Sequence, residues 1–188
     1  MTLHIYPSSD YSPSFCIAAA RILELESGYS DDPEDPGHAT KYGISQRANP
    51  NVDLNKLTST GAVEIYHQLY WLPLQLDSLP SPSIATLVLN GAVLFGVYGA
   101  TKAIQRGLND ITPTPQLKID GIYGRLTQGS LISACQLHPL LTWHAIASSF
   151  KLRAAFVAGD NPTSRKFRES WCSRFTASLE NRVNLHIG

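Results

Sequence analysis

The chain has 188 residues, of which 43% are hydrophobic and 16% are charged. This length and composition suit a well-packed globule and exclude a disordered, collagen-like or coiled-coil protein. The 15 basic and 15 acidic side chains cancel, which excludes a surface built throughout to neutralise nucleic acid or anionic lipid. They are unevenly placed, since residues 1–100 hold 10 acidic and 4 basic side chains and residues 151–188 hold 3 and 7.

The first predicted helix follows the N-terminal segment MTLHIYPSSDYSPSF. This segment lacks the basic start and long apolar run of a secretory signal, so we expect synthesis in the cytoplasm. Ser12 and Pro13 form a helix start signal. Apolar residues follow at helical spacing, Glu26 is the last residue on the same face, and Gly28 is suited to end the helix.

The region after this helix is predicted to be an irregular lobe. Residues 29–56 contain clustered prolines, glycines and acidic residues, which favour loops and a short hairpin. Helical spacing then returns, and we expect helices from Thr58 or Thr60 to Trp71 and at about 82–94, 97–109, 124–136, 138–159 and 164–184. The predicted fold class is therefore mainly α, a helical bundle with a small irregular or β-hairpin lobe.

One uncharged stretch, Ile84 to Ala100, is near the lower limit of length for a membrane span. It contains Asn90 and three glycines, and Lys102 and Arg106 follow in helical phase. We interpret it as a buried core helix without stable membrane insertion. A holin, which this stretch alone suggests, is the weaker alternative.

No pattern in the sequence indicates a metal or an organic cofactor, and we expect neither. The histidines do not have ligand spacing, and a Gly-rich phosphate loop is absent. Cys16, Cys135 and Cys172 are odd in number and widely spaced, which predicts free thiols rather than a zinc site or a disulfide framework.

The most informative segment is LELESGYSDDPEDPGHATKYGIS, residues 23–45. Glu26 ends an otherwise apolar helix face, where partial burial and the negative end of the helix favour the neutral form that a general acid requires. The alternative is that Glu26 turns into solvent or caps a neighbouring group. Four further carboxylates follow within ten residues, on Asp31, Asp32, Glu34 and Asp35.

A calcium loop and a solvated turn are two other interpretations of this acidic cluster. The calcium loop fits poorly, because Pro33 interrupts the ligand positions, Pro36 occupies the place of the sharp-turn glycine and Tyr42 the place of the last ligand. A solvated turn accounts for most of the acids. One of them can still act as a base, because an inverting glycosidase separates its acid and base by about 6.5–9.5 Å across a water.

The spacing of Glu26, Asp35 and Thr40 resembles the glutamate, aspartate and threonine triad of phage-type lysozymes. The surrounding ESGYSDDPEDPGHATKYGIS resembles the EGGY, DPxDPGG and TxYGI signature of glycoside hydrolase family 108 muramidases. The turn at residues 120–124, DGIYG, is similar to that family's C-terminal peptidoglycan-binding region. The resemblance implies a lysozyme-like fold, with a catalytic region at residues 12–98 and a helical peptidoglycan-binding-like region at residues 99–184 packed on it.

The resemblance also implies an activity, an N-acetylmuramidase of bacterial peptidoglycan, acting as a monomer and without nucleic acid. Glu26 would protonate the glycosidic oxygen, Asp35 would orient or deprotonate the water with the help of Thr40, and Asp32 is a reserve base. The residues implied to line the glycan groove are Tyr29, Tyr42, Gln46, Tyr70, Trp71 and Asn90. For Trp71 the alternative is core packing.

The sequence departs from the family pattern at Asn90 and Leu94, where an aspartate and an asparagine are usual. Asn90 is therefore either a substrate contact or a structural hydrogen-bonding residue. Two other functions stay open for the same fold, a non-catalytic cell-wall-binding or secretion-scaffold protein and a lytic transglycosylase, which needs the acid but no base. A muramidase could serve as a phage endolysin, in protein export or as a delivered effector.

Overall fold

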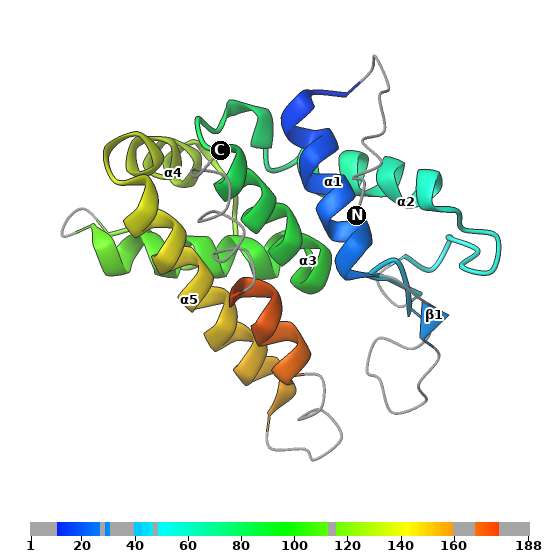
Figure 1. Ribbon diagram of the computed structural model, residues 1–188. Coiled ribbons are helices and arrows are strands. Elements are labelled where there is room, and N and C mark those ends of the chain that lie inside the picture. The colour runs from blue at the N-terminus through cyan, green and yellow to red at the C-terminus, as the bar shows by residue number, and fades with distance from the viewer. Residues whose placement is uncertain are drawn as a thin grey trace, which may run out of the picture. The chain divides into compact units, whose positions relative to one another are not determined.

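The structure is a computed structural model that describes residues 11–26, 29–30, 40–46, 49–112, 116–159 and 168–176, with only the backbone described at 29–30. It is mainly helical, with one small antiparallel sheet (Figure 1). The chain divides into two compact units, Met1–Gly99 and Ala100–Gly188. The predicted mainly α fold class is confirmed.

Helix α1 (Pro13–Leu25) begins where the sequence predicts. The hydroxyl of Ser12 accepts a hydrogen bond of 3.2 Å from the backbone N–H of Phe15, and Pro13 occupies the first turn, where its missing N–H costs nothing. The helix ends earlier than the predicted stop at Gly28, which lies outside the described residues. Glu26 is the C-cap, and its N–H donates to the carbonyl of Ile22 at 2.9 Å.

The second helical segment consists of α2 (Ser59–Tyr66) and the π-helix η1 (His67–Trp71), which follows directly. Thr58 caps α2 by accepting a 3.1 Å hydrogen bond from Gly61, which confirms the start predicted at Thr58. Phe15 of α1 packs edge-on against Trp71 with ring centroids 5.1 Å apart. This contact joins α1 to the second segment in the core of the first unit.

Two short elements complete the framework of this unit. The 3₁₀ helix η2 (Leu76–Ser78) lies against α1, where the Ser12 hydroxyl donates to the Asp77 carboxylate. Strands β1 (Tyr29–Ser30), β2 (Thr40–Lys41) and β3 (Ile44–Ser45) form an antiparallel sheet in that order. The sheet confirms the hairpin expected in the irregular lobe.

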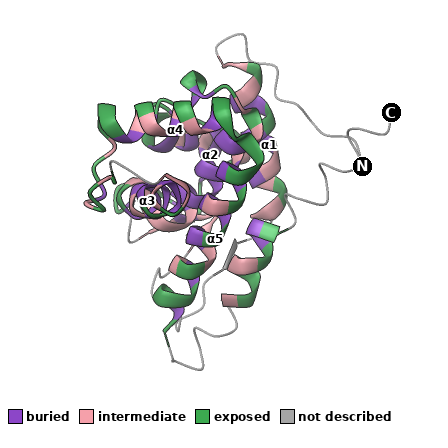
Figure 2. Ribbon diagram, turned by 90° about the vertical axis from the view of Figure 1, so that its left-hand side faces the viewer, coloured by how far each residue is buried: buried purple, intermediate pink, exposed green. Residues whose placement is uncertain are grey.

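Helix α3 (Pro82–Ile111) runs from the first unit into the second and is broken at Gly96, with φ 70° and ψ 166°. This backbone conformation is open to glycine but strained for other residues, so the two helices predicted at 82–94 and 97–109 correspond to the two halves of α3. By length and composition α3 could cross a membrane, but 67% of its most apolar stretch is buried within the protein (Figure 2). That burial is consistent with the predicted core helix.

The second unit contains the C-terminal half of α3, α4 (Arg125–Leu137), α5 (Pro139–Ala158) and a helix over residues 168–176. Gly107 lets α3 approach α5 closely, because a β-carbon there would lie 2.9 Å from the Ala145 carbonyl oxygen. Phe150 of α5 stacks on Phe175 with ring centroids 5.0 Å apart. The helices predicted at 124–136 and 138–159 are confirmed; of the one predicted at 164–184, the described part is helical.

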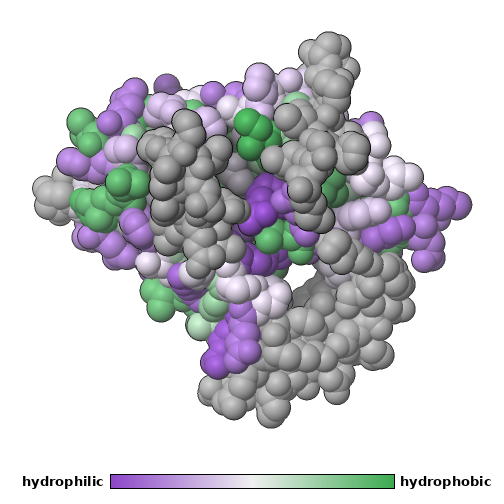
Figure 3. Space-filling view, in the orientation of Figure 1, coloured by the Kyte–Doolittle hydropathy of each residue, from purple (hydrophilic) through white to green (hydrophobic). Residues whose placement is uncertain are grey.

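The surface of the protein mixes hydrophilic and hydrophobic groups, as the face in Figure 3 shows. The most exposed large apolar side chains of the second unit are Leu126 and Phe156, at 81% and 83%. Scattered exposed apolar side chains such as these two are usual on protein surfaces.

The three cysteines are free, as predicted, and Cys16 and Cys135 are buried.

Candidate active site

The half-buried carboxyl group of Glu26 lies against the turn between β2 and β3. A β-carbon on Gly43 would be only 2.6 Å from Glu26 Oε1 and 2.7 Å from its Cδ. The same β-carbon would be 2.8 Å from Cγ1 of Val93 on α3. The carboxyl group at the end of α1 and a methyl group of α3 therefore meet on one side of the Gly43 backbone.

The turn beneath this carboxyl has an unusual backbone. Tyr42 and Gly43, its two central residues, have φ values of 52° and 70°, as a type I′ hairpin turn requires. Glycine adopts this conformation freely, whereas Tyr42 is strained in it. The buried Tyr66 of α2 donates its hydroxyl to the Tyr42 carbonyl at 2.5 Å, which holds the strained residue in place.

Thr40 belongs to the hairpin whose turn lies against the Glu26 carboxyl. Thr40 lies on the central strand β2, opposite Ser30 of β1 and Ser45 of β3, and is half-buried. It precedes Gly43, the residue under the Glu26 carboxyl, by three positions. Of the predicted triad, Glu26 therefore lies at the end of α1 and Thr40 on the hairpin that its carboxyl contacts.

The other two predicted acid–base residues, Asp35 and Asp32, lie outside the described residues, and their roles stay predictions. Tyr29 belongs to β1, opposite Lys41, and only its backbone is described. Tyr42 is half-buried, and Lys41 Nζ lies 5.8 Å from the centre of its ring. Of these two tyrosines, the side chain of Tyr42 is the one that the structure describes.

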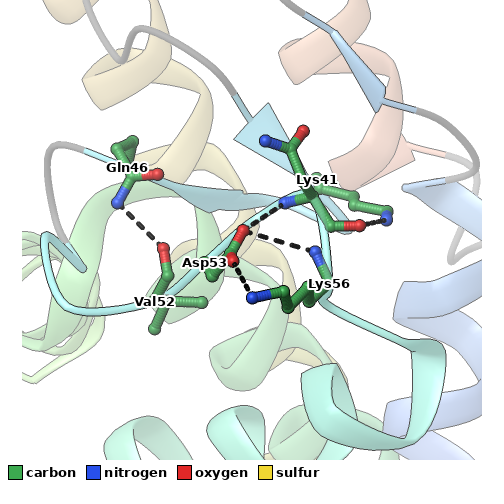
Figure 4. A network of polar contacts seen from close by, with 6 residues as sticks. Lys41, Gln46, Val52, Asp53 and Lys56 are labelled. Carbon is green, nitrogen blue, oxygen red and sulfur yellow. Dashed lines mark hydrogen bonds and ion pairs between the residues drawn. The ribbon is translucent and has the colours of Figure 1, made fainter.

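Gln46, predicted to contact the glycan, holds a loop of the protein. Its amide nitrogen donates to the carbonyl of Val52 at 2.9 Å (Figure 4). It also donates to the carbonyls of Asn49 and Pro50, each at 3.2 Å. These bonds occupy the amide hydrogens of Gln46. Its contact with an N-acetyl group of the glycan stays a prediction.

The same loop is joined to β2 by a second group of contacts. Lys41 Nζ donates to the Asn55 carbonyl at 3.4 Å, and the Asp53 carboxylate accepts from the Asn55 backbone at 3.1 Å (Figure 4). Lys56 Nζ pairs with Asp53 at 3.2 Å. These bonds order the chain between the hairpin and α2.

Two predicted aromatic contacts, Tyr70 and Trp71, lie in the core. Trp71 has no exposed surface, so its ring packs against Phe15 and does not present a face to solvent, which is the core alternative left open by the sequence. Tyr70 is 7% exposed, and burial raises the pKa of its hydroxyl, opposed by a hydrogen bond with Asn49. Both residues are therefore core residues in this structure.

Asn90 is buried on α3, with 2% of its surface exposed. Its Oδ1 has no hydrogen-bond partner within the described part of the protein. A buried polar atom without a hydrogen bond lowers the stability of the fold by about 1–3 kcal/mol. Such atoms therefore usually have a functional role or bind a water molecule. Asn90 precedes Val93 by three residues, which places the two on one face of the helix.

Sequence reasoning missed the parts played by Gly43, Val93 and Tyr66. The Tyr-Gly pair at 42–43 is a turn signal, but nothing local indicates that a distant carboxyl lies on it. Val93 belongs to an apolar run in which no residue stands out.

Within the described ranges, no three His, Cys, Asp or Glu side chains are grouped so that they could hold a metal ion.

Comparison with known proteins matches part of the chain to one family and the fold to one solved structure. Residues 19–96 match the family described as glycosyl hydrolase 108, a range that contains Glu26, the hairpin and Val93. The fold resembles the structure of SagA from Brucella abortus, with a TM-score of 0.70 and 23% sequence identity over 93% of this chain and 97% of that one. No curated protein sequence matches the chain.

The family match agrees with the resemblance over residues 19–96. The structural match shows that the fold is mainly α and lysozyme-like. The likeness of residues 120–124 to a peptidoglycan-binding region stays a prediction, because the family match ends at residue 96.

Proposed function

We propose that the protein is a peptidoglycan hydrolase of the lysozyme type, an N-acetylmuramidase. It cleaves the β-1,4 bond between N-acetylmuramic acid and N-acetylglucosamine. The observation that carries the proposal is the Glu26 carboxyl seated on Gly43 within the residues that match glycosyl hydrolase 108. A half-buried carboxyl with a fixed position at a helix end is suited to protonate a leaving oxygen.

In the proposed reaction Glu26 gives its proton to the glycosidic oxygen as the bond from that oxygen to C1 breaks. A water on the opposite face of the sugar forms the new bond to C1 and loses a proton to Asp35, assisted by the Thr40 hydroxyl. The products are a reducing N-acetylmuramic acid and an N-acetylglucosamine with a free hydroxyl. With a water between the two carboxyls the configuration at C1 is inverted. Asp32 is the reserve base.

The proposed substrate is bacterial peptidoglycan, and the protein acts on it in the cell wall as an endolysin, in protein export or as a delivered effector. Tyr42 offers a partly open ring for a sugar face. The second unit is proposed to bind peptidoglycan. The protein is proposed to act as a monomer.

The test is digestion of purified sacculi by the wild type and by Glu26→Gln, followed by analysis of the released muropeptides. Glu24→Gln is the matched control, because Glu24 is an exposed acid on the same helix, paired with Arg21 at 2.9 Å. We expect reducing ends from the wild type and the control and almost none from Glu26→Gln. Anhydro ends would identify a lytic transglycosylase, and release that does not depend on Glu26 would leave a non-catalytic wall-binding protein.

A further inference from the structure

Val93 lies at the site, although the proposed reaction gives it no part. It is 6% exposed on α3, and its Cγ1 lies 2.8 Å from the point where a β-carbon on Gly43 would be. Oε1 of Glu26 lies 2.6 Å from the same point. Oε1 of Glu26 and Cγ1 of Val93 therefore border the same small space beside the Gly43 backbone.

We propose that Val93 is a positioning residue that keeps the Glu26 carboxyl over Gly43; this rests on the proposed function of Glu26. A valine in a helix has one strongly preferred rotamer, so its methyl groups form a rigid wall. A glutamate side chain has several rotatable bonds and samples many positions unless its surroundings restrict it. The methyl groups of Val93 supply this restriction, although α3 is far from Glu26 in the sequence.

The Gly43 backbone, which also borders the carboxyl, is rigid as well. The Gly43 backbone belongs to the type I′ turn, and Tyr66 of α2 holds that turn through the Tyr42 carbonyl at 2.5 Å. The carboxyl of α1 is therefore placed by parts of α2, α3 and the hairpin. A displacement of about 1 Å in such a group can lower the rate of a reaction about 100-fold.

The experiment compares Val93→Ala with Val88→Ala on sacculi. Val88 is the matched control, because it is a fully buried valine of the same helix that lies five residues away, on a different face. Both variants create a cavity and should lose similar thermal stability. We expect Val93→Ala to lower kcat about 10- to 100-fold with KM within about twofold, and Val88→Ala to keep the wild-type kcat.

A third variant, Val93→Thr, separates an effect on the position of the Glu26 carboxyl from an effect on the stability of the fold. Threonine has the shape of valine but carries a hydroxyl, so burying it should lower stability while the wall remains. We expect it to restore kcat to within about threefold of the wild type. If Val93→Ala does not fold, Val93→Cys, which removes one of the two branches, takes its place with the same expected direction.

The possible results distinguish the two proposals. Wild-type kcat in Val93→Ala, or equal losses in Val93→Ala and Val88→Ala, would overturn the role of Val93 while Glu26→Gln stays inactive. A kcat of Val93→Thr as low as that of Val93→Ala would also overturn it. An active Glu26→Gln would instead overturn the proposed function, and the role of Val93 with it.

Discussion

The carboxyl group of Glu26 fills the space in which Gly43 would carry a side chain. The separation between Glu26 Oε1 and an ideal β-carbon on Gly43 would be 2.6 Å, closer than two such atoms can stand. The acid and the turn are therefore fitted to each other. Glycine is needed at residue 43 for this fit as well as for its φ of 70°.

Gly43→Ala tests this relationship. The new methyl group must displace the carboxyl, and we expect the activity on sacculi to fall at least about 100-fold, as misplaced catalytic groups do. The positive φ adds a cost of about 1–2 kcal/mol in stability. Gly159→Ala is the control, because Gly159 has φ 56° and no atom of the described residues lies within 4 Å of its β-carbon position. Equal activities of the two variants would contradict the fit.

Tyr66→Phe tests whether the turn must be held from α2. The change removes the hydroxyl that donates to the Tyr42 carbonyl, so the strained Tyr42 loses its restraint. We expect the free energy of unfolding in urea to fall by about 0.5–1.5 kcal/mol, the usual value of one hydrogen bond. The activity should fall more than the folded fraction does. An unchanged urea midpoint would show that the bond does not hold the turn.

Asn90→Leu separates the two roles left open for Asn90. Leucine has a similar size and no polar atom, so it removes the unpaired buried Oδ1. We expect an unchanged or higher stability, by up to about 3 kcal/mol, together with a loss of activity on sacculi. Thermal unfolding and muropeptide release measure the two effects. Full activity would assign Asn90 a structural role.

The loop before α4 contains a carboxylate whose pKa is shifted. Asp120 accepts a 3.0 Å hydrogen bond from the Ile122 backbone and one of 2.9 Å from Gln105 Nε2. The first of these bonds contributes most to holding the Asp120 pKa below its ordinary value of 3.8. Gln105 also accepts from the Gly121 N–H at 2.9 Å, so one buried amide fixes both sides of the turn.

The lowered pKa of Asp120 predicts a dependence of stability on pH. A carboxyl whose pKa is lower in the folded state stabilises the fold above its unfolded pKa and loses this effect as the pH falls through the folded value. Asp120→Asn should therefore be less stable than the wild type at neutral pH, and the difference should shrink as the pH falls below about 4. Urea unfolding at several pH values measures this, and a constant difference would contradict it.

The local sequence determined where the helices lie along the chain and that Glu26 lies at the end of the first one. Ser12 and Thr58 cap the helices that they were predicted to start, and Gly96 breaks α3 between its two predicted halves. Glu26 lies half-buried at the end of an apolar helix face, as its spacing indicated. These features follow from helical periodicity, side-chain caps and the backbone freedom of glycine, which act between neighbours in the chain.

Only the tertiary structure decided what surrounds Glu26. It brought Gly43 and Val93 to the carboxyl, placed the whole of Trp71 in the core and turned the Gln46 amide toward its own loop. The sequence contains no local sign of these contacts, because they join elements that are distant along the chain. Their geometry depends on how side chains of particular shape fill the space between packed elements, and periodicity carries no information about that.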